Sequence, residues 1–282
     1  MAAEQVTPSL AYHGEGPVWS ERWGGLRWVD MLAGDVLRLT VDGGVERKHV
    51  GEVAAALRPR TGGGAVIGIE RGFALEDPDG ELTRLDQLWT DEGIRMNEGG
   101  CDPDGRFYCG SMAYDKRPGA GAVYRLDPDR SARVVLAEVT VSNGLDWSPD
   151  GTLAYYNDTD TYRTDVFDYD PETGLTNRRP FVAYDTEDGR PDGLTVDSEG
   201  GVWIAMNGAG AVRRYTPQGS LDAVVELPVA KVTACAFGGP GLDRLFLTTS
   251  RENLPPDADP SAGALFCADA EVSGLSVREF AG

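Results

Sequence analysis

The sequence predicts an all-β fold, a six-bladed β-propeller that spans residues 1–282 as a single domain. Three observations support this prediction: a repeat of strand-like runs, turn-forming residues along the whole chain, and no long apolar pattern with a helical period. The chain contains 37 glycines and 17 prolines, and 41% of its residues are hydrophobic. This composition is typical of a globular protein built from many short strands.

The repeat consists of six apolar runs, each opened by a tight turn, at residues 24–30, 63–70, 104–112, 150–158, 200–206 and 242–250. Each run is followed by a second run and another turn, at residues 36–44, 73–81, 122–130, 165–174, 211–219 and 264–270. Each unit is therefore a meander of short strands, about 40 to 50 residues long, and six units fit a six-bladed propeller. A β-sandwich is the alternative, although it requires no such regular repeat. We also expect the segment before Glu15 to complete the last blade.

Charge and composition exclude several classes of partner. The net charge is −20, and an acidic surface repels phosphate backbones, so no nucleic-acid partner is expected. No apolar run approaches the roughly 18 residues that a membrane span needs, and the opening MAAEQVTPSL does not read as a signal peptide. We therefore expect a cytoplasmic protein with free thiols at its four cysteines, either a monomer or a small homo-oligomer.

One residue in each repeat stands at a nearly constant distance before a turn glycine. Asn97, Asn143 and Asp192 lie eight residues before Gly105, Gly151 and Gly200. The same offset selects Ala55 and Thr233, and Glu15 lies nine residues before Gly24. Because the first strand of each propeller blade lines the central channel, equivalent positions lie together. The polar members are expected at one mouth of the channel: Glu15, Asn97, Asn143, Asp192 and Thr233.

Three of these residues carry hard oxygen donors and precede a glycine: Glu15, Asn143 and Asp192. Two carboxylates and an amide suit Ca²⁺, Mg²⁺ or Mn²⁺ and tolerate Zn²⁺. Each dipeptide alone would be read as an ordinary turn. Their common phase favours a shared metal site in the central channel.

Five segments resemble the senescence-marker-protein/regucalcin/gluconolactonase family of six-bladed propellers: residues 14–19 (GEGPVW), 95–112, 142–159, 190–205 and 233–250. The resemblance implies a metal-dependent lactonase, commonly acting on sugar lactones. It implies one divalent cation (Ca²⁺, Zn²⁺, Mn²⁺, Mg²⁺ or Fe²⁺) held by Glu15, Asn143 and Asp192. Carried over in the same way, Arg95 and Asn97 would contact the substrate. Asp115 stands at the position of a further substrate-contacting residue, which is a longer glutamate in the family, and would also contact the substrate.

The predicted function is hydrolysis of a small-molecule lactone, most simply an aldonolactone, to its hydroxy acid. Asp192 is the expected general base, and Glu15 is the alternative. An organophosphate or aryl-ester hydrolase of the same fold and a non-catalytic calcium-binding regulator remain as rival functions. Ser-His-Asp catalysis is poorly supported, because the chain has two histidines and no G-x-S-x-G motif.

Overall fold

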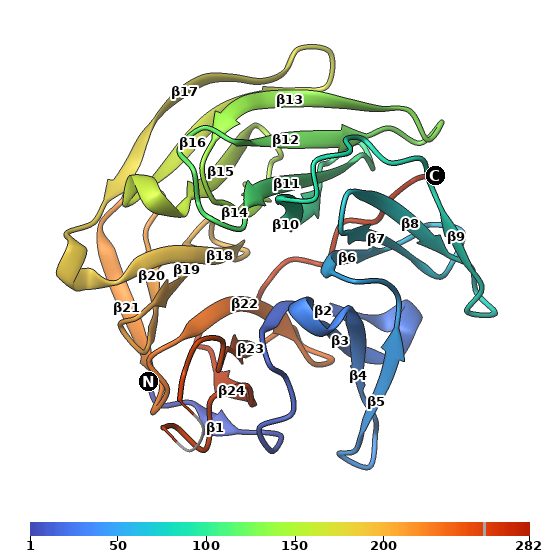
Figure 1. The fold of residues 1–282 in the computed structure, drawn as a ribbon. Coiled ribbons are helices and arrows are strands. Elements are labelled where there is room, and N and C mark those ends of the chain that lie inside the picture. Colours follow the sequence, from blue (N-terminus) through green and yellow to red (C-terminus); the bar gives the residue numbers. More distant parts are fainter. Residues whose placement is uncertain (256–257) are drawn as a thin grey trace.

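The computed structural model describes residues 1–255 and 258–282, and its strands form six four-stranded sheets arranged as a ring (Figure 1). This confirms the predicted six-bladed propeller. The only helices in the described residues are four single turns of 3₁₀ type, η1 (Glu21–Trp23), η2 (Met31–Ala33), η3 (Thr159–Thr161) and η4 (Thr186–Asp188). None of these has the length or apolar character to cross a bilayer.

The first four blades are meanders whose strands pair in chain order. Blade I contains β2 (Gly14–Ser20), β3 (Gly25–Asp30), β4 (Asp35–Leu39) and β5 (Val45–His49). Blade II contains β6 (Ala54–Pro59), β7 (Ala65–Ile69), β8 (Gly72–Glu76) and β9 (Leu82–Arg84). Blade III contains β10 (Ile94–Cys101), β11 (Phe107–Ala113), β12 (Gly121–Leu126) and β13 (Ala132–Val139). Blade IV contains β14 (Ser142–Trp147), β15 (Leu153–Asp158), β16 (Arg163–Asp170) and β17 (Gly174–Ala183).

The last two blades close the ring. Blade V contains β18 (Arg190–Val196), β19 (Val202–Asn207), β20 (Ala211–Tyr215) and β21 (Leu221–Glu226). Blade VI contains β22 (Val232–Gly238), β23 (Arg244–Thr249), β24 (Leu265–Asp269) and the N-terminal strand β1 (Glu4–Gln5). Because β1 pairs antiparallel with β24, the first and last strands of the chain share one sheet (Figure 1). The expectation that the N-terminal segment completes the last blade is therefore confirmed.

Aspartates fix the turns between first and second strands in blades III and V. The Asp102 carboxylate accepts backbone N–H groups of Asp104 and Arg106, and Asp197 does the same for Glu199 and Gly201. Each turn passes through a glycine with positive φ, for instance Gly105 at 74° and Gly200 at 83°. A residue with a Cβ would be strained there, which explains why these glycines mark the repeat so clearly in the sequence.

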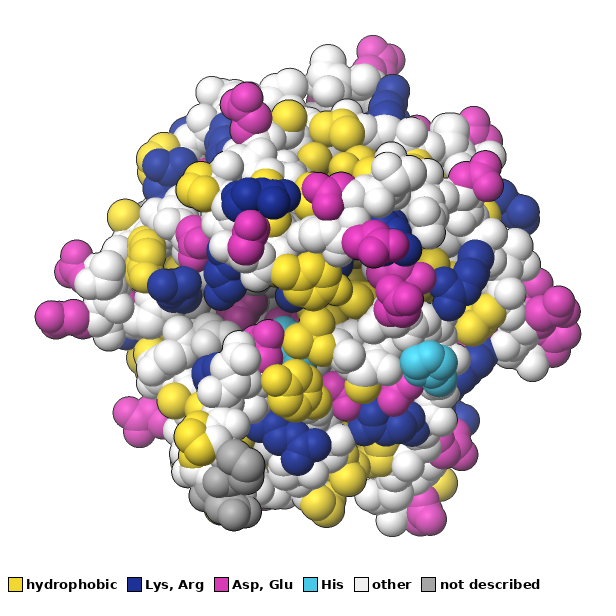
Figure 2. Space-filling view, viewed as in Figure 1, with side chains coloured by type: hydrophobic (Ala, Val, Ile, Leu, Met, Phe, Trp, Pro, Cys, Tyr) yellow, Lys and Arg dark blue, Asp and Glu magenta, His cyan; other side chains and the backbone are white. Residues whose placement is uncertain are grey.

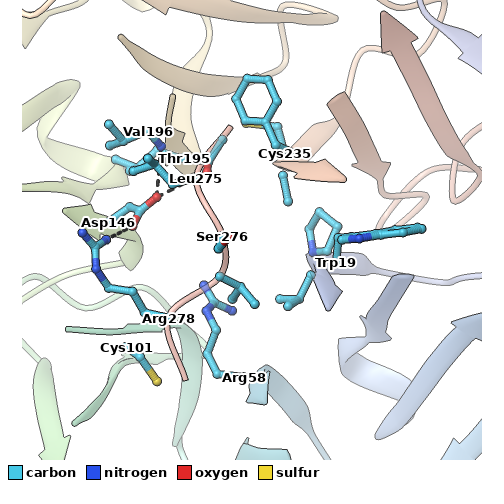
Figure 3. A pocket seen from close by; sticks show the side chains of 17 residues that line it. Trp19, Arg58, Cys101, Asp146, Thr195, Val196, Cys235, Leu275, Ser276 and Arg278 are labelled. Carbon is cyan, nitrogen blue, oxygen red and sulfur yellow. Dashed lines mark hydrogen bonds and ion pairs between the residues drawn. The ribbon is translucent and has the colours of Figure 1, made fainter. Parts of the chain in front are cut away.

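The C-terminal segment crosses the end of the channel where the first strands finish. Leu275, Ser276 and Arg278 line a cavity there, together with residues from the ends of the first strands (Figure 3). The segment is held by backbone hydrogen bonds from Phe280 to Pro59 and from Ala281 to Gly105, of 2.8 and 2.9 Å. The channel therefore carries a strap of chain at this end.

Phe280 anchors that strap, because its side chain is fully buried in the largest apolar cluster. We expect Phe280→Ala to lower the free energy of unfolding by about 3–5 kcal/mol, since it leaves a cavity the size of a phenyl ring. Urea denaturation followed by circular dichroism measures this loss. Val41→Ala is the matched control, because Val41 is fully exposed and its truncation should cost almost nothing. A loss below about 1 kcal/mol for Phe280→Ala would show that the strap is not part of the core.

Candidate functional site

The first strands begin around a cavity of about 230 Å³ at the opposite end of the channel. Five of the residues singled out in the sequence line it: Glu15, Arg95, Asn97, Asn143 and Asp192. Figure 2 shows a hollow near the centre of one face of the molecule, with acidic side chains deep inside it. One water needs only about 10–15 Å³ of such space, so the cavity has room for a small molecule.

A β-bulge aims the candidate side chain in each of four blades. The pairing between first and second strands shifts register at or beside Glu15, Asn97, Asn143 and Asp192. A bulge places two residues opposite one and re-aims their side chains. The constant offset in the sequence is therefore the distance from the bulge to the following turn.

Glycines follow three of these bulged residues, and after Asn143 and Asp192 the reason is that neighbouring first strands nearly touch. A Cβ on Gly144 would lie 2.4 Å from the backbone nitrogen of Leu194, in the next blade. A Cβ on Gly193 would lie 2.5 Å from the Cβ of Ala234, again in the next blade. Only glycine fits at these positions, so the pairs Asn143-Gly144 and Asp192-Gly193 are features of strand packing.

Two buried side-chain oxygens in the cavity have no hydrogen-bond partner among the described residues, Oδ1 of Asn143 and Oδ1 of Asp192. The other atom of each group is fixed. Nδ2 of Asn143 donates to Oγ1 of Thr159 at 3.0 Å, and Oδ2 of Asp192 accepts from Nδ2 of Asn207 at 2.8 Å. Unpaired buried acceptors are costly unless a ligand satisfies them. Two oriented acceptors beside the Glu15 carboxylate fit a hard divalent cation.

No three His, Cys, Asp or Glu side chains gather as a metal cluster in the part of the chain that the structure describes. The candidate site has only two such side chains, Glu15 and Asp192, and its third side chain is the amide of Asn143. The donors are therefore all oxygens, with two negative charges between them. This composition is typical of sites for hard cations.

Buried carboxylates repel one another at this end of the channel. Burial raises the pKa of Asp192 to about 7, and the charge on Glu98 adds to the shift. Burial also raises the pKa of Glu15 well above its usual value, with Asp192 and Glu98 as the next causes. Oε2 of Glu98 is itself buried without a partner in residues 1–255 and 258–282, and burial raises the pKa of this carboxyl too. The folded chain thus concentrates negative charge that a cation would stabilise.

Arg95 and Asn97 form a linked pair on β10. Nη1 of Arg95 donates to Oδ1 of Asn97 at 2.6 Å, and Nδ2 of Asn97 donates to the carbonyl of Ser142 at 2.7 Å. Nε of Arg95 is buried and finds no acceptor in the described part of the chain, and its guanidinium lies 5.5 Å from the centre of the Tyr114 ring. Both side chains are therefore held rigidly in the wall of the cavity.

Two sequence candidates lie elsewhere. Thr233 is fully buried, and its hydroxyl donates to the carbonyl of Gly14 at 2.6 Å, so it does not line the cavity. Asp115 is exposed, and its carboxylate accepts from Arg117 instead of facing the cavity. The structure brings Tyr114 and Lys116, on either side of Asp115, to the cavity.

Several further lining residues carry no clear signal in the sequence. His13 bonds to Oγ of Ser250 at 2.7 Å, and its Nε2 lies 3.8 Å from Oε1 of Glu15. Burial, followed by the charges of Arg95 and then of Lys231 and Lys116, lowers the pKa of His13 to about 3, so the ring is neutral. Asn207 is the last residue of β19. A polar residue at the end of a buried strand is the one sequence pattern that could have marked it as a cavity residue. The lysines come from loops, where no repeat constrains the chain.

The metal-free protein should lose stability as pH rises from 6.5 to 8.5. The pKa of Asp192 is raised on folding, from about 3.9 to about 7. Its contribution is therefore full at low pH and is lost as pH rises through 7. His13 acts in the opposite direction, but only below its unfolded pKa of about 6.5. Thermal melts in a chelator should show a falling Tm.

Asp192→Asn should reduce this pH dependence, because the amide is neutral at every pH used, and the part that remains comes from Glu15, whose pKa is also raised. Asp115→Asn is the matched control, since Asp115 is exposed and should leave the slope of the wild-type protein in place. Equal slopes for the Asp192→Asn variant and the wild-type protein would contradict the raised pKa.

Known proteins resemble this chain over its whole length. Residues 13–251 match the family model described as SMP-30/Gluconolactonase/LRE-like region. Regucalcin of Oryctolagus cuniculus is 35% identical, over 98% of this chain and 95% of its own. YvrE of Bacillus subtilis (strain 168), provisionally named a sugar lactone lactonase, is 34% identical, over 100% and 99%. A crystal structure of Agrobacterium tumefaciens regucalcin, described as a calcium-binding protein, superposes with a TM-score of 0.92 at 30% identity, covering 99% and 98%. The chain belongs to the SMP-30/gluconolactonase/LRE-like family.

Proposed function

We propose that this protein is a divalent-cation-dependent lactonase that hydrolyses a sugar lactone to its hydroxy acid. The observation that carries the proposal is the pair of unpartnered oxygens on Asn143 and Asp192, which lie beside Glu15 in a small cavity of the described structure. Membership of a gluconolactonase-like family supports the same activity. The name of YvrE favours a sugar lactone as the substrate class.

Glu15, Asn143 and Asp192 would hold the cation through their oxygens. When bound, a divalent cation there would polarise the lactone carbonyl and make a bound water more acidic. Thr159 and Asn207 fix the other atoms of Asn143 and Asp192, so the free oxygens keep their direction. Such outer partners orient ligands and are part of a working site.

Asp192 is the proposed general base. With Oδ1 turned to the cation, Oδ2 would take the proton, and its hydrogen bond from Nδ2 of Asn207 keeps it in place. It would take a proton from water as the water oxygen attacks the carbonyl carbon. It would return that proton to the ring oxygen as the bond between carbonyl carbon and ring oxygen breaks. Glu15 is the alternative base, although its Oε2 already accepts the N–H of Gly16 at 3.2 Å.

Arg95 and Asn97 would orient the lactone ring. Their mutual hydrogen bond fixes both groups, and Nε of Arg95, unpartnered within the described residues, is available as a donor. Ring hydroxyls offer both donors and acceptors to such a pair. Holding the ring in a single orientation lowers the entropic part of the barrier.

A calcium-binding protein without catalytic activity is the second candidate, because the Agrobacterium regucalcin is described as a calcium-binding protein. An acid-release assay over aldonolactones, aryl esters and phosphotriesters separates the candidates. We expect turnover of an aldonolactone with Ca²⁺, Mn²⁺, Zn²⁺ or Fe²⁺ added, and its loss in a chelator. Turnover of none of these substrates with any of the metals would favour the binding protein.

Asp192→Ala and Asn97→Ala should change different kinetic constants when both variants are saturated with metal. Asp192→Ala removes the base and a ligand, so kcat should fall by roughly 100-fold or more. Asn97→Ala removes an orienting amide, so KM should rise, or kcat/KM should fall for hydroxylated lactones alone. Steady-state kinetics on one aldonolactone and one lactone without hydroxyls measures both effects.

Circular dichroism must show both variants folded for the comparison to count. A folded Asp192→Ala protein with near-normal kcat would overturn the proposed mechanism. In that case, the Glu15→Gln variant would show whether the alternative carboxylate is the base.

A further inference from the structure

The cavity contains positive charges that the hydrolysis of a neutral lactone does not use. The chain has three lysines, Lys48, Lys116 and Lys231, and two of them line this cavity. Lys48 is paired with Glu76 at 2.8 Å. By contrast, neither Lys116 nor Lys231 has a carboxylate oxygen within 4.0 Å among residues 1–255 and 258–282.

Local structure directs both lysines to the cavity. Lys116 follows β11 with a left-handed backbone, at φ 56°. Its neighbour Arg117 lies near the carboxylates of Asp115 and Asp91, at 3.4 and 3.7 Å. Lys231 precedes β22, and its ammonium donates to the backbone carbonyl of Glu252. Lys116 therefore faces the cavity, whereas its neighbours Asp115 and Arg117 form an ion pair with each other.

The charges of the lining residues can be counted. Arg190 is already paired with Asp160 at 2.9 Å, and this pair is left out. Three cations remain, Arg95, Lys116 and Lys231, against three carboxylates, Glu15, Asp192 and Glu252. A divalent cation would bring the sum for these lining residues to about +2, and the buried Glu98 carboxylate nearby would reduce it to about +1, on a chain whose net charge is −20.

Such a positive site would attract an anionic group on the substrate. In Figure 2, Lys and Arg side chains border the hollow, and acidic side chains lie deeper inside it. A neutral aldonolactone offers hydroxyls and a carbonyl, and nothing on it calls for two ammonium groups without a carboxylate partner. The carboxylate created by ring opening forms at the reacting carbon, so it lies where the cation is held.

We propose that the substrate is a lactone that carries a carboxylate of its own, such as the lactone of an aldaric acid, and that Lys116 and Lys231 bind this carboxylate. This inference rests on the proposed lactonase function. Lysine suits the task, because its ammonium is a compact charge on a flexible stem. Asp115 faces away from the cavity, so no carboxylate at that position opposes an anionic substrate.

Matched lactones test the proposal. The 1,4-lactones of D-glucaric and D-gluconic acid differ in one terminal group, a carboxylate in place of a primary alcohol. In low salt, kcat/KM should be at least about tenfold higher for glucarolactone, and added salt should reduce the ratio. In Lys116→Met/Lys231→Met, the ratio should fall at least about tenfold, the loss expected when charge-assisted contacts are removed.

Arg117→Met is the matched control. It removes a positive charge from the same loop, and its side chain does not line the cavity, so the ratio should stay at the wild-type value. The single variant Lys116→Met keeps the test usable if the double variant fails to fold, because Lys116 is exposed. An unchanged ratio in a folded lysine variant would overturn the proposal.

Calorimetry on the calcium-loaded protein provides a readout without turnover. D-glucarate should bind at least about tenfold more tightly than D-gluconate, and the lysine variant should bind the two alike. Equal binding by the wild-type protein would count against the proposal. Hydrolysis of gluconolactone with no preference for glucarolactone overturns this inference alone. Hydrolysis of neither lactone overturns the proposed function, and this inference with it.

Discussion

The close approach of six first strands around one axis constrains everything else in this molecule. Neighbouring strands come so near that Gly144 and Gly193 leave no room for a Cβ. Each of the six first strands shifts its pairing with the second strand where it enters the channel. These bulges turn side chains towards the axis, so a residue at the bulge must be small, bonded to a neighbour or, as proposed here, part of a ligand site. Ala55, Thr233 and Asp192 illustrate the three outcomes.

Acids gather near the axis as a consequence of this geometry. Glu15, Glu98 and Asp192 come from three different blades, yet all three are buried near the axis. Burial raises the pKa of each, the charge of Glu98 raises that of Asp192 further, and both charges raise that of Glu15. The fold leaves oxygens of Glu98 and Asp192 without partners in the described residues. Hydrophobic packing of the blades supplies the stability that permits this, because a core of large buried side chains surrounds the channel. The strap through Phe280 adds to that core at the other end.

The sequence was informative wherever the repeat imposes a rule. The offset from Asn97, Asn143 and Asp192 to a turn glycine is the length of strand between bulge and turn, and ring symmetry keeps it constant. Thr233 obeys the offset and still leaves the site, because its hydroxyl bonds to the carbonyl of Gly14. Asp115 could not be placed, because its loop has no counterpart in other blades. A left-handed residue beside it decides which side chain faces inward.

Strands and loops contribute different properties to the proposed site: the strands carry the groups proposed for the reaction, and the loops carry the charge at the entrance. The groups proposed for the reaction stand on first strands, where moving one residue would flip its neighbours and disturb the adjoining blade. Lys116 and Lys231 stand on connections, where a change in length or charge leaves the ring intact. A propeller of this kind can therefore keep one reactive centre while its loops change the charge of the entrance. The two cavity lysines are the feature of this chain that such a separation would allow to vary, because they line the cavity from its connections and not from its first strands.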